Sequence, residues 1–215
     1  MDGRTKPVHS LARRLLRDAE FCRDRDSRVE AATELVEHLP RTAHDIELLL
    51  TLTPHRLSAE VQYSVLNVLD SLPLRNADVR RLLPTVSKVL QEVDSRAAFL
   101  WMKAGCLLGD GFLKAANGGT RQRILFNLAR IMRTAQSHHA RAGALHGIEH
   151  ALNHAGLRDG KRLLRVLREV ALHDRAVSLR RSSFSLLHDG YWWGNGGLGE
   201  LHRYARKLAK PLQYR

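Results

Sequence analysis

The chain has 215 residues, enough for one large domain or a short repeat array with a substantial buried core. Its 35 Lys and Arg outnumber its 22 Asp and Glu, and the net charge of +13 favours nucleic acid, anionic lipid or acidic proteins as partners without choosing among them. Aromatic residues make up only 6% of the chain, and no uninterrupted apolar run approaches the roughly 20 residues of a membrane span, so we expect a soluble protein with an aliphatic core.

Amphipathic stretches with helical spacing follow one another along the whole chain, and no stretch alternates as a strand does. An unpaired helix is predicted over 8–21, and five helical pairs are predicted after it. The first helices of the pairs begin near residues 26, 58, 94, 137 and 176, a spacing typical of two-helix solenoid repeats. The second helices are predicted over 44–52, 76–90, 119–133, 160–172 and 199–210, with turns marked by Pro40, Pro54, Pro73 and Gly-rich segments.

The repeat starts carry a shared pattern. Residues 26–28 and 94–96 both read Asp-Ser-Arg, Arg141 takes the equivalent place in the fourth copy, and an apolar ladder follows each start. Over about 26–210 the chain resembles the HEAT-like repeat family. The resemblance implies an all-α fold, a right-handed α-solenoid of about five HEAT-like pairs plus an N-terminal helix, with 1–215 forming a single domain. It implies no activity, because such repeats host scaffolds, nucleic-acid binders and a few enzymes.

The segment 145–154, LHGIEHALNH, places His146, His150 and His154 four residues apart and spells the inverted zinc-protease motif H-x-x-E-H. On a helical wheel the histidines lie opposite the apolar residues of this segment, which are Leu145, Ile148, Ala151, Leu152 and Ala155. We interpret the histidines as a solvated helix face and predict no metal site. Whether the three histidines bind metal stays open at this stage.

Two further motifs lie near the C-terminal end. The string GNGGLG at 194–199 spells a dinucleotide-binding fingerprint, but no βαβ unit surrounds it, so we interpret it as a turn and predict no cofactor. The neighbouring aromatics Tyr191, Trp192 and Trp193 have two interpretations. They cap the end of the solenoid, or one of them is exposed and stacks on a base or contacts a partner protein.

The later second helices are strongly basic. In HEAT-like solenoids the second helices generally line the concave surface, so the resemblance implies a basic trough in the C-terminal half. The alternative is that these charges only keep exposed helix faces soluble. The predicted nucleic-acid-binding residues are Arg123, Asn127, Arg130, Lys161, Arg162, Arg165, Arg168, Arg203, Arg206 and Lys207.

Three functions remain open. The main prediction is a non-catalytic repeat protein that binds DNA, RNA or another polyanion on its basic concave surface. The alternative is a protein–protein interaction scaffold that recognises an acidic partner. The third is similarity to the HEAT-like-repeat DNA glycosylases, which act on alkylated bases. Residue types suited to that enzyme are present, but no catalytic residue carries over: Trp101, Asp110, Asp189, Trp192 and Trp193.

Location and assembly are the last expectations from the sequence. The two cysteines, Cys22 and Cys106, lie in apolar stretches, which is typical of reduced thiols in a cytoplasmic protein. The sequence gives no oligomeric state and no choice between DNA, RNA and an acidic protein.

Overall fold

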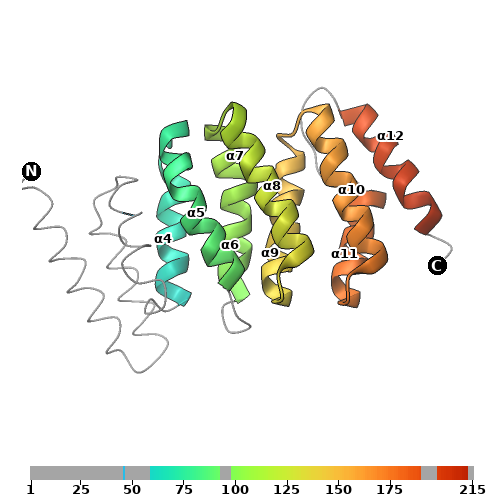
Figure 1. Ribbon diagram of the computed structural model, residues 1–215, viewed down its shortest axis with the longest axis horizontal. Coiled ribbons are helices and arrows are strands. Elements are labelled where there is room, and N and C mark those ends of the chain that lie inside the picture. Colours follow the sequence, from blue (N-terminus) through green and yellow to red (C-terminus); the bar gives the residue numbers. More distant parts are fainter. Residues whose placement is uncertain (1–45, 47–58, 93–97, 190–197, 213–215) are drawn as a thin grey trace, which may run out of the picture.

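The computed structural model describes residues 46, 59–92, 98–189 and 198–212, and these residues form helices joined by short turns (Figure 1). The described helices are α4 (Ala59–Ser71), α5 (Asn76–Glu92), α6 (Ala98–Cys106), η1 (Leu107–Gly111), α7 (Phe112–Ala115), α8 (Gly118–Thr134), α9 (His138–Leu152), α10 (Leu157–His173), α11 (Val177–Asp189), α12 (Leu198–Ala209) and η2 (Lys210–Leu212). The predicted all-α class is confirmed. The predicted N-terminal helix and first pair lie outside the described residues, except for Ile46.

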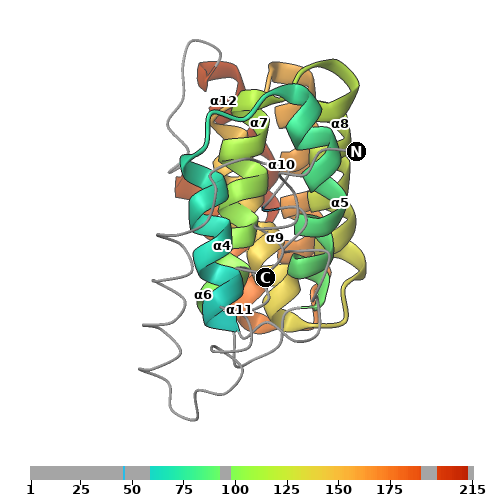
Figure 2. The same cartoon turned by 90° about the vertical axis from the view of Figure 1, so that its left-hand side faces the viewer.

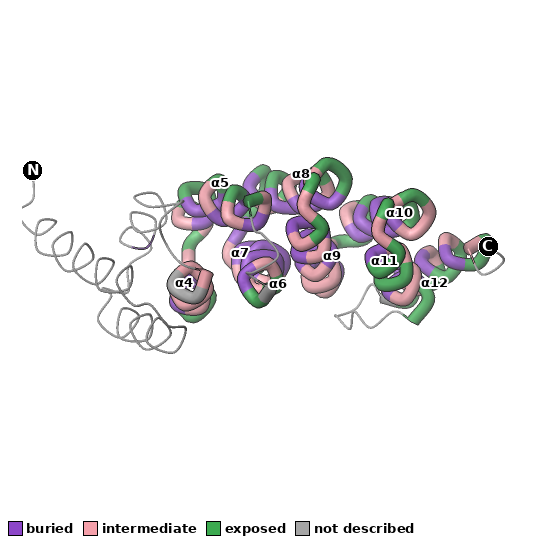
Figure 3. The backbone as a smooth tube through the Cα atoms, turned by 90° about the horizontal axis from the view of Figure 1, so that it is seen from below, coloured by how far each residue is buried: buried purple, intermediate pink, exposed green. Residues whose placement is uncertain are grey.

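The helices stack in two layers, which identify the chain as an α-solenoid (Figure 3). The first layer consists of α4, the continuous helix α6–η1–α7, α9 and α11, and the second layer consists of α5, α8 and α10. Helix α12 packs at the C-terminal end of the stack, against both α10 and α11. Viewed along the long axis, α4 and α6 lie on one side and α5 and α8 on the other (Figure 2). No helix in the described part of the chain has the length and apolar character needed to cross a membrane.

The core between the layers is aliphatic, as the composition predicts. The wheel of α8 predicts Leu125, Leu128 and Met132 on one side, and all three are buried. In α9 the buried side includes Leu145 and Ile148. These residues recur every three or four positions, so each helix turns one stripe toward its neighbours and leaves the opposite face to solvent.

Local side-chain hydrogen bonds fix where the helices begin. The carboxylate of Asp78 accepts the backbone N–H of Arg75 just before α5, at 2.9 Å. The hydroxyl of Ser137 accepts the N–H of Ala140 at the start of α9. Such caps satisfy backbone donors that have no partner within the helix. At the turn before α8, Gly118 has φ +41°, a backbone conformation that side chains other than glycine rarely adopt.

Four glycines bring α9 against the α6–η1 segment at very short range. Gly105 and Gly109 face Gly143 and Gly147, and each pair is spaced four residues apart on its helix. A Cβ on Gly109 would overlap the backbone carbonyl of Gly147, and a Cβ on Gly147 would lie 2.7 Å from the carbonyl oxygen of Gly105. The two backbones therefore touch where side chains normally separate helices. We call these four residues the glycine crossing.

A π-helical turn, η1, lies inside the continuous helix that runs from Ala98 to Ala115. Gly109 of the glycine crossing belongs to this turn, and so does Asp110. A π-turn inserts one extra residue and rotates everything after it relative to everything before it. Leu107 and Leu108 inside this turn and Phe112 directly after it are all buried.

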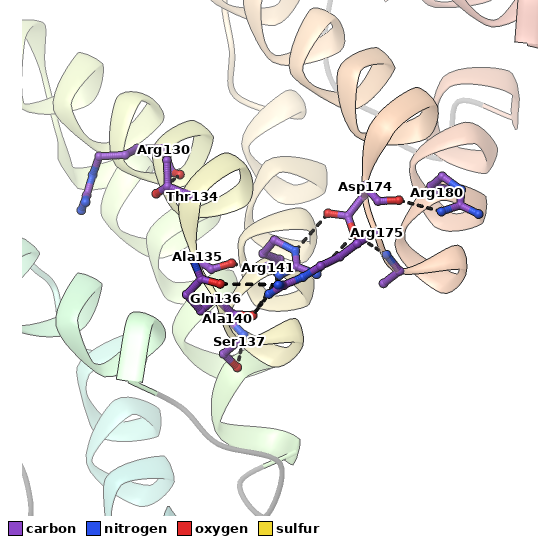
Figure 4. Close-up of polar contacts among 11 residues, drawn as sticks. Arg130, Thr134, Ala135, Gln136, Ser137, Ala140, Arg141, Asp174, Arg175 and Arg180 are labelled. Carbon is purple, nitrogen blue, oxygen red and sulfur yellow. Dashed lines mark hydrogen bonds and ion pairs between the residues drawn. The ribbon is translucent and has the colours of Figure 1, made fainter.

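A buried ion pair joins the last two described repeats (Figure 4). Arg141 of α9 donates through Nε and Nη2 to the carboxylate of Asp174, at 2.9 and 3.3 Å, and the two side chains are only 5% and 7% exposed. Asp174 lies in the turn before α11, where it also accepts the N–H of Ala176. Nη1 of Arg141 donates to the backbone carbonyls of Ala135 and Gln136, just after α8. One guanidinium thus ties α8, α9 and the α10–α11 turn together.

Candidate binding groove

A hollow of about 400 Å³ lies on the second layer, between α8 and α10. Its walls are two facing stripes, one from each helix, with residues spaced three or four apart. The residues of α8 are Gln122, Leu125, Phe126, Ala129 and Arg133, and those of α10 are Asp159, Arg162, Leu163, Arg165, Val166 and Glu169. We call this feature the α8–α10 groove.

The floor of the groove is apolar, and a single aromatic ring stands at its edge. Leu125, Leu163 and Val166 are buried and belong to the core, whereas Phe126 is 67% exposed. Exposure of a phenyl ring to water is unfavourable. Removing apolar surface from water lowers the free energy by about 0.8 kcal/mol for each CH₂ group that is buried. A partner that covers Phe126 and fills the hollow would gain this hydrophobic energy.

The rim of the groove is charged. Arg133 pairs with Glu169 across the groove, with Nε and Oε2 2.7 Å apart. Nη1 of Arg162 lies 4.0 Å from Oδ1 of Asp159, which is a weak ion pair. Arg165 donates through Nε to the hydroxyl of Tyr204 in α12 at 2.9 Å. The phenol orients this guanidinium without neutralising it, so the remaining donors of Arg165 are directed by the fold and still attract an anion.

Charge is divided unequally between the two layers. The second-layer helices α5, α8 and α10 carry twelve Lys and Arg and only four Asp and Glu, and α12 carries three and one, whereas the first-layer helices carry five of each. The basic excess of the described helices therefore lies on the layer that contains the α8–α10 groove. A field of one sign over one face favours anionic partners on that face.

The structure brings two of the predicted binding residues, Arg162 and Arg165, into the groove. Two others have partners within the fold: the amide of Asn127 donates to the Ser87 hydroxyl of α5 at 3.2 Å, and Lys161 pairs with Glu200 at 2.6 Å. The remaining predicted residues are exposed on α8, α10 and α12 outside the groove: Arg123, Arg130, Arg168, Arg203, Arg206 and Lys207. The predicted aromatics Tyr191, Trp192 and Trp193 lie outside the described residues.

Sequence reasoning did not identify Phe126 as a functional residue. On the wheel of α8 it lies away from the buried stripe formed by Leu125, Leu128 and Met132. A large apolar side chain on the polar side of an amphipathic helix is a signal that could have found it. The residue types named for a glycosylase-like enzyme lie elsewhere, since Trp101 and Asp110 belong to the first layer.

The three histidines also belong to the first layer and are half-buried, not fully solvated as predicted. Nε2 of His146 and Nε2 of His150 lie 3.3 Å apart, and Nδ1 of His146 lies 3.4 Å from a carboxylate oxygen of Glu149. Burial, together with the nearby His146, lowers the pKa of His150. The hydrogen bond from His146 lowers the pKa of Glu149 despite its burial. These shifts favour a neutral imidazole on His150 and an ionised carboxylate on Glu149.

Asp110 of η1 is the carboxylate that holds the end of α9. It accepts hydrogen bonds from Lys114 and from Nε2 of His154. Burial acts to raise the pKa of Asp110, but these two hydrogen bonds outweigh it and the pKa is lowered. A carboxylate with a lowered pKa stabilises the fold above its ordinary pKa, and this contribution is lost as the pH falls through the folded-state value.

We expect Asp110→Asn to lower the free energy of unfolding at pH 7, and the difference from the unsubstituted chain to shrink as the pH drops below about 4. Urea unfolding followed by circular dichroism at a series of pH values measures this difference. A deficit that stays the same at pH 3 would show that the Asn side chain disturbs packing and that the carboxylate charge does not matter.

Comparison with known proteins gives one structural likeness. No protein-family model matches the chain, and no curated protein matches it significantly. A crystal structure of computationally designed armadillo repeat proteins for modular peptide recognition is similar, with 14% sequence identity and a TM-score of 0.39. The alignment covers 97% of this chain and 91% of that chain.

Proposed function

We propose that this chain is a non-catalytic helical-repeat scaffold that binds an acidic segment of a partner protein in the α8–α10 groove. The observation that carries the proposal is the combination of an apolar hollow, the exposed ring of Phe126 and the oriented cation of Arg165 in one place. Such a site suits a segment with an aliphatic or aromatic side chain beside one or more carboxylates. The ring and the hollow take the apolar group, and Arg162 and Arg165 take the carboxylates.

The groove itself favours a protein partner over a nucleic acid. Its rim contains the carboxylates of Asp159 and Glu169, which repel a phosphate backbone, and its floor is aliphatic. Nucleic-acid surfaces rely on Lys and Arg that track successive phosphates. A peptide can instead place its own cationic or neutral groups opposite the two acids while its carboxylates meet Arg162 and Arg165.

The proposal is tested with peptides selected from a random display library against the immobilised full chain. We expect the selected peptides to combine Asp or Glu with Leu, Phe or Trp. The same peptides with their apolar residues replaced by serine serve as charge-matched probes, and a single-stranded oligodeoxynucleotide serves as the polyanion probe. Tight binding of the selected peptides with weak binding of the serine versions supports the groove as a protein site. Equal binding of both peptide forms contradicts it.

We expect Phe126→Ala to weaken binding of the selected peptides about five- to thirtyfold, the range of about 1 to 2 kcal/mol that a central aromatic contact contributes. Arg165→Glu should weaken binding by at least as much. The unfolding free energy of Phe126→Ala should change little, because the ring is 67% exposed. Isothermal titration calorimetry measures the affinities. The matched control is Arg181→Glu, the same charge reversal at an exposed position of first-layer α11, which should leave binding unchanged.

Nucleic-acid binding is the second candidate, and the charge division between the layers is the observation that favours it. It predicts that the oligodeoxynucleotide binds more tightly than the selected peptides, with an affinity that falls steeply as salt rises. It also predicts a large loss on reversing Arg123 and Arg130 to Glu, which lie outside the groove, and little effect of Phe126→Ala. These outcomes would replace the protein-binding proposal.

A further inference from the structure

The side chains of His146 and His150 form a close pair on α9 of the first layer, whereas the groove lies between α8 and α10 of the second layer. They lie one helical turn apart on α9, with ring centroids 4.6 Å apart and ring planes nearly perpendicular at 89°. Their Nε2 atoms are closer than the centroids, at 3.3 Å. The Nε2 corners of the two rings are therefore inclined toward each other.

The distance between the two Nε2 atoms equals the distance between two nitrogens that bind the same metal ion. Tetrahedral coordination with metal–nitrogen bonds of about 2.0 to 2.1 Å places two ligand nitrogens about 3.3 Å apart. Two histidines at positions i and i+4 of a helix are a recurring source of such a pair. The existing contact between His146 and His150 thus has the spacing that metal binding needs, without a change of backbone.

A carboxylate behind one imidazole completes the arrangement. Nδ1 of His146 lies 3.4 Å from a carboxylate oxygen of Glu149, so this carboxylate can accept a hydrogen bond from Nδ1–H while Nε2 binds an ion. Metal-binding histidines commonly donate their second N–H to a carboxylate in this way, which fixes the ring and raises its basicity. Nε2 of the third histidine, His154, contacts Asp110 instead.

We propose that His146 and His150 form a binding site for a divalent transition-metal ion, with Glu149 as a positioning residue behind His146. Imidazole nitrogens suit Zn²⁺, Cu²⁺ and Ni²⁺ and are poor ligands for Mg²⁺ and Ca²⁺. No group of three potential ligands occurs together in the described residues, so the two imidazoles are the ligands that this part of the chain supplies. Water or a ligand from a bound molecule fills the other positions.

The geometry separates this site from a zinc protease, although the sequence spells H-x-x-E-H. A protease of that type needs the motif glutamate beside the metal-bound water, where it acts as general base. Here Glu149 contacts Nδ1, the ring nitrogen that faces away from the shared Nε2 position. The carboxylate therefore orients a ligand and does not reach the water, so the proposal is for metal binding and not for hydrolysis.

The test measures Zn²⁺ and Ni²⁺ binding to the tag-free full chain by competition with a chromophoric chelator. We expect binding of one ion per chain, weakened at least tenfold by His146→Gln and by His150→Gln. Glu149→Gln should weaken it about tenfold, the effect typical of losing a carboxylate behind a ligand. The matched control replaces both His138 and His139 by glutamine; these are adjacent in sequence on the same helix, and their ring centroids are 5.5 Å apart against 4.6 Å for His146 and His150.

Nuclear magnetic resonance gives a second readout that does not depend on affinity. Addition of Zn²⁺ should shift the Nε2 resonances of His146 and His150 and leave those of His138 and His139 in place. Circular dichroism checks that each variant remains helical. Equal losses from the His146 and His138/His139 variants, or no loss from either, mean an adventitious ion only and overturn the proposal. The α8–α10 groove lies on the other layer, so failure here leaves the proposed function unaffected.

Discussion

Gly109→Ala is expected to lower the free energy of unfolding by about 3 kcal/mol or more. The added methyl group would overlap the backbone carbonyl of Gly147 at the glycine crossing. Overpacking a core usually costs about 1 to 3 kcal/mol when side chains can move aside. Here the obstacle is backbone, which has no other rotamer, so η1 and α9 must separate. Their separation would also loosen the buried side chains next to the crossing, including Leu128 and Ile148.

The control for this prediction is Gly119→Ala in the first turn of α8, where an added Cβ meets nothing within 4 Å. Alanine there should leave stability unchanged or raise it by about 0.5 to 1 kcal/mol, since it restricts the unfolded chain. Urea unfolding followed by circular dichroism measures both variants. Similar stabilities for the two variants would mean that α6–η1 and α9 do not meet at their glycines.

Arg141→Met is the second substitution with a large expected effect, a loss of about 3 to 5 kcal/mol. It leaves the carboxylate of Asp174 buried without its cation, and it removes the donor to the carbonyls of Ala135 and Gln136. Because an unpaired buried charge accounts for most of this cost, Arg141→Met combined with Asp174→Leu should be less destabilising than the sum of the two single substitutions.

An exposed ion pair provides the comparison. Arg133 and Glu169 form a contact as short as that of Arg141 and Asp174, but their side chains are 45% and 54% exposed. Arg133→Met should therefore cost less than about 1 kcal/mol. Urea unfolding of the three single variants and the double variant gives all these values. An additive double variant, or a loss from Arg133→Met equal to that from Arg141→Met, would show that burial does not determine the strength of these pairs.

The sequence predicts the helices well because the spacing of apolar residues along each helix shows which of its faces is buried. Leu125, Leu128 and Met132 repeat at helical spacing, and the Pro73 and Asn-Gly-Gly turns interrupt the pattern where the structure has turns. Both signals are local, so no knowledge of neighbouring repeats is needed to interpret them. The all-α class follows from such local signals alone.

The Arg141–Asp174 ion pair and the α8–α10 groove are harder to predict than the helices, because both depend on contacts between residues that are far apart in the sequence. Arg141 and Asp174 are 33 residues apart, and no local pattern shows that they pair. The groove exists only because two stripes on α8 and α10 face each other without closing. Arg162 and Arg165 were predicted from charge, whereas Phe126 required knowledge of which helix face is covered. The π-turn at η1 likewise leaves no periodic signal.

The unequal charges of the two layers give the described part of the chain an electric dipole across its thickness. A negatively charged body that drifts within about 8 Å, the screening distance at physiological ionic strength, exerts a torque on this dipole. The torque turns α8, α10 and α12 toward the negatively charged partner before the two molecules make contact. This orientation raises the association rate more than it raises the lifetime of the complex. Selection of one face would thus begin during diffusion, and added salt would slow arrival while leaving departure nearly unchanged.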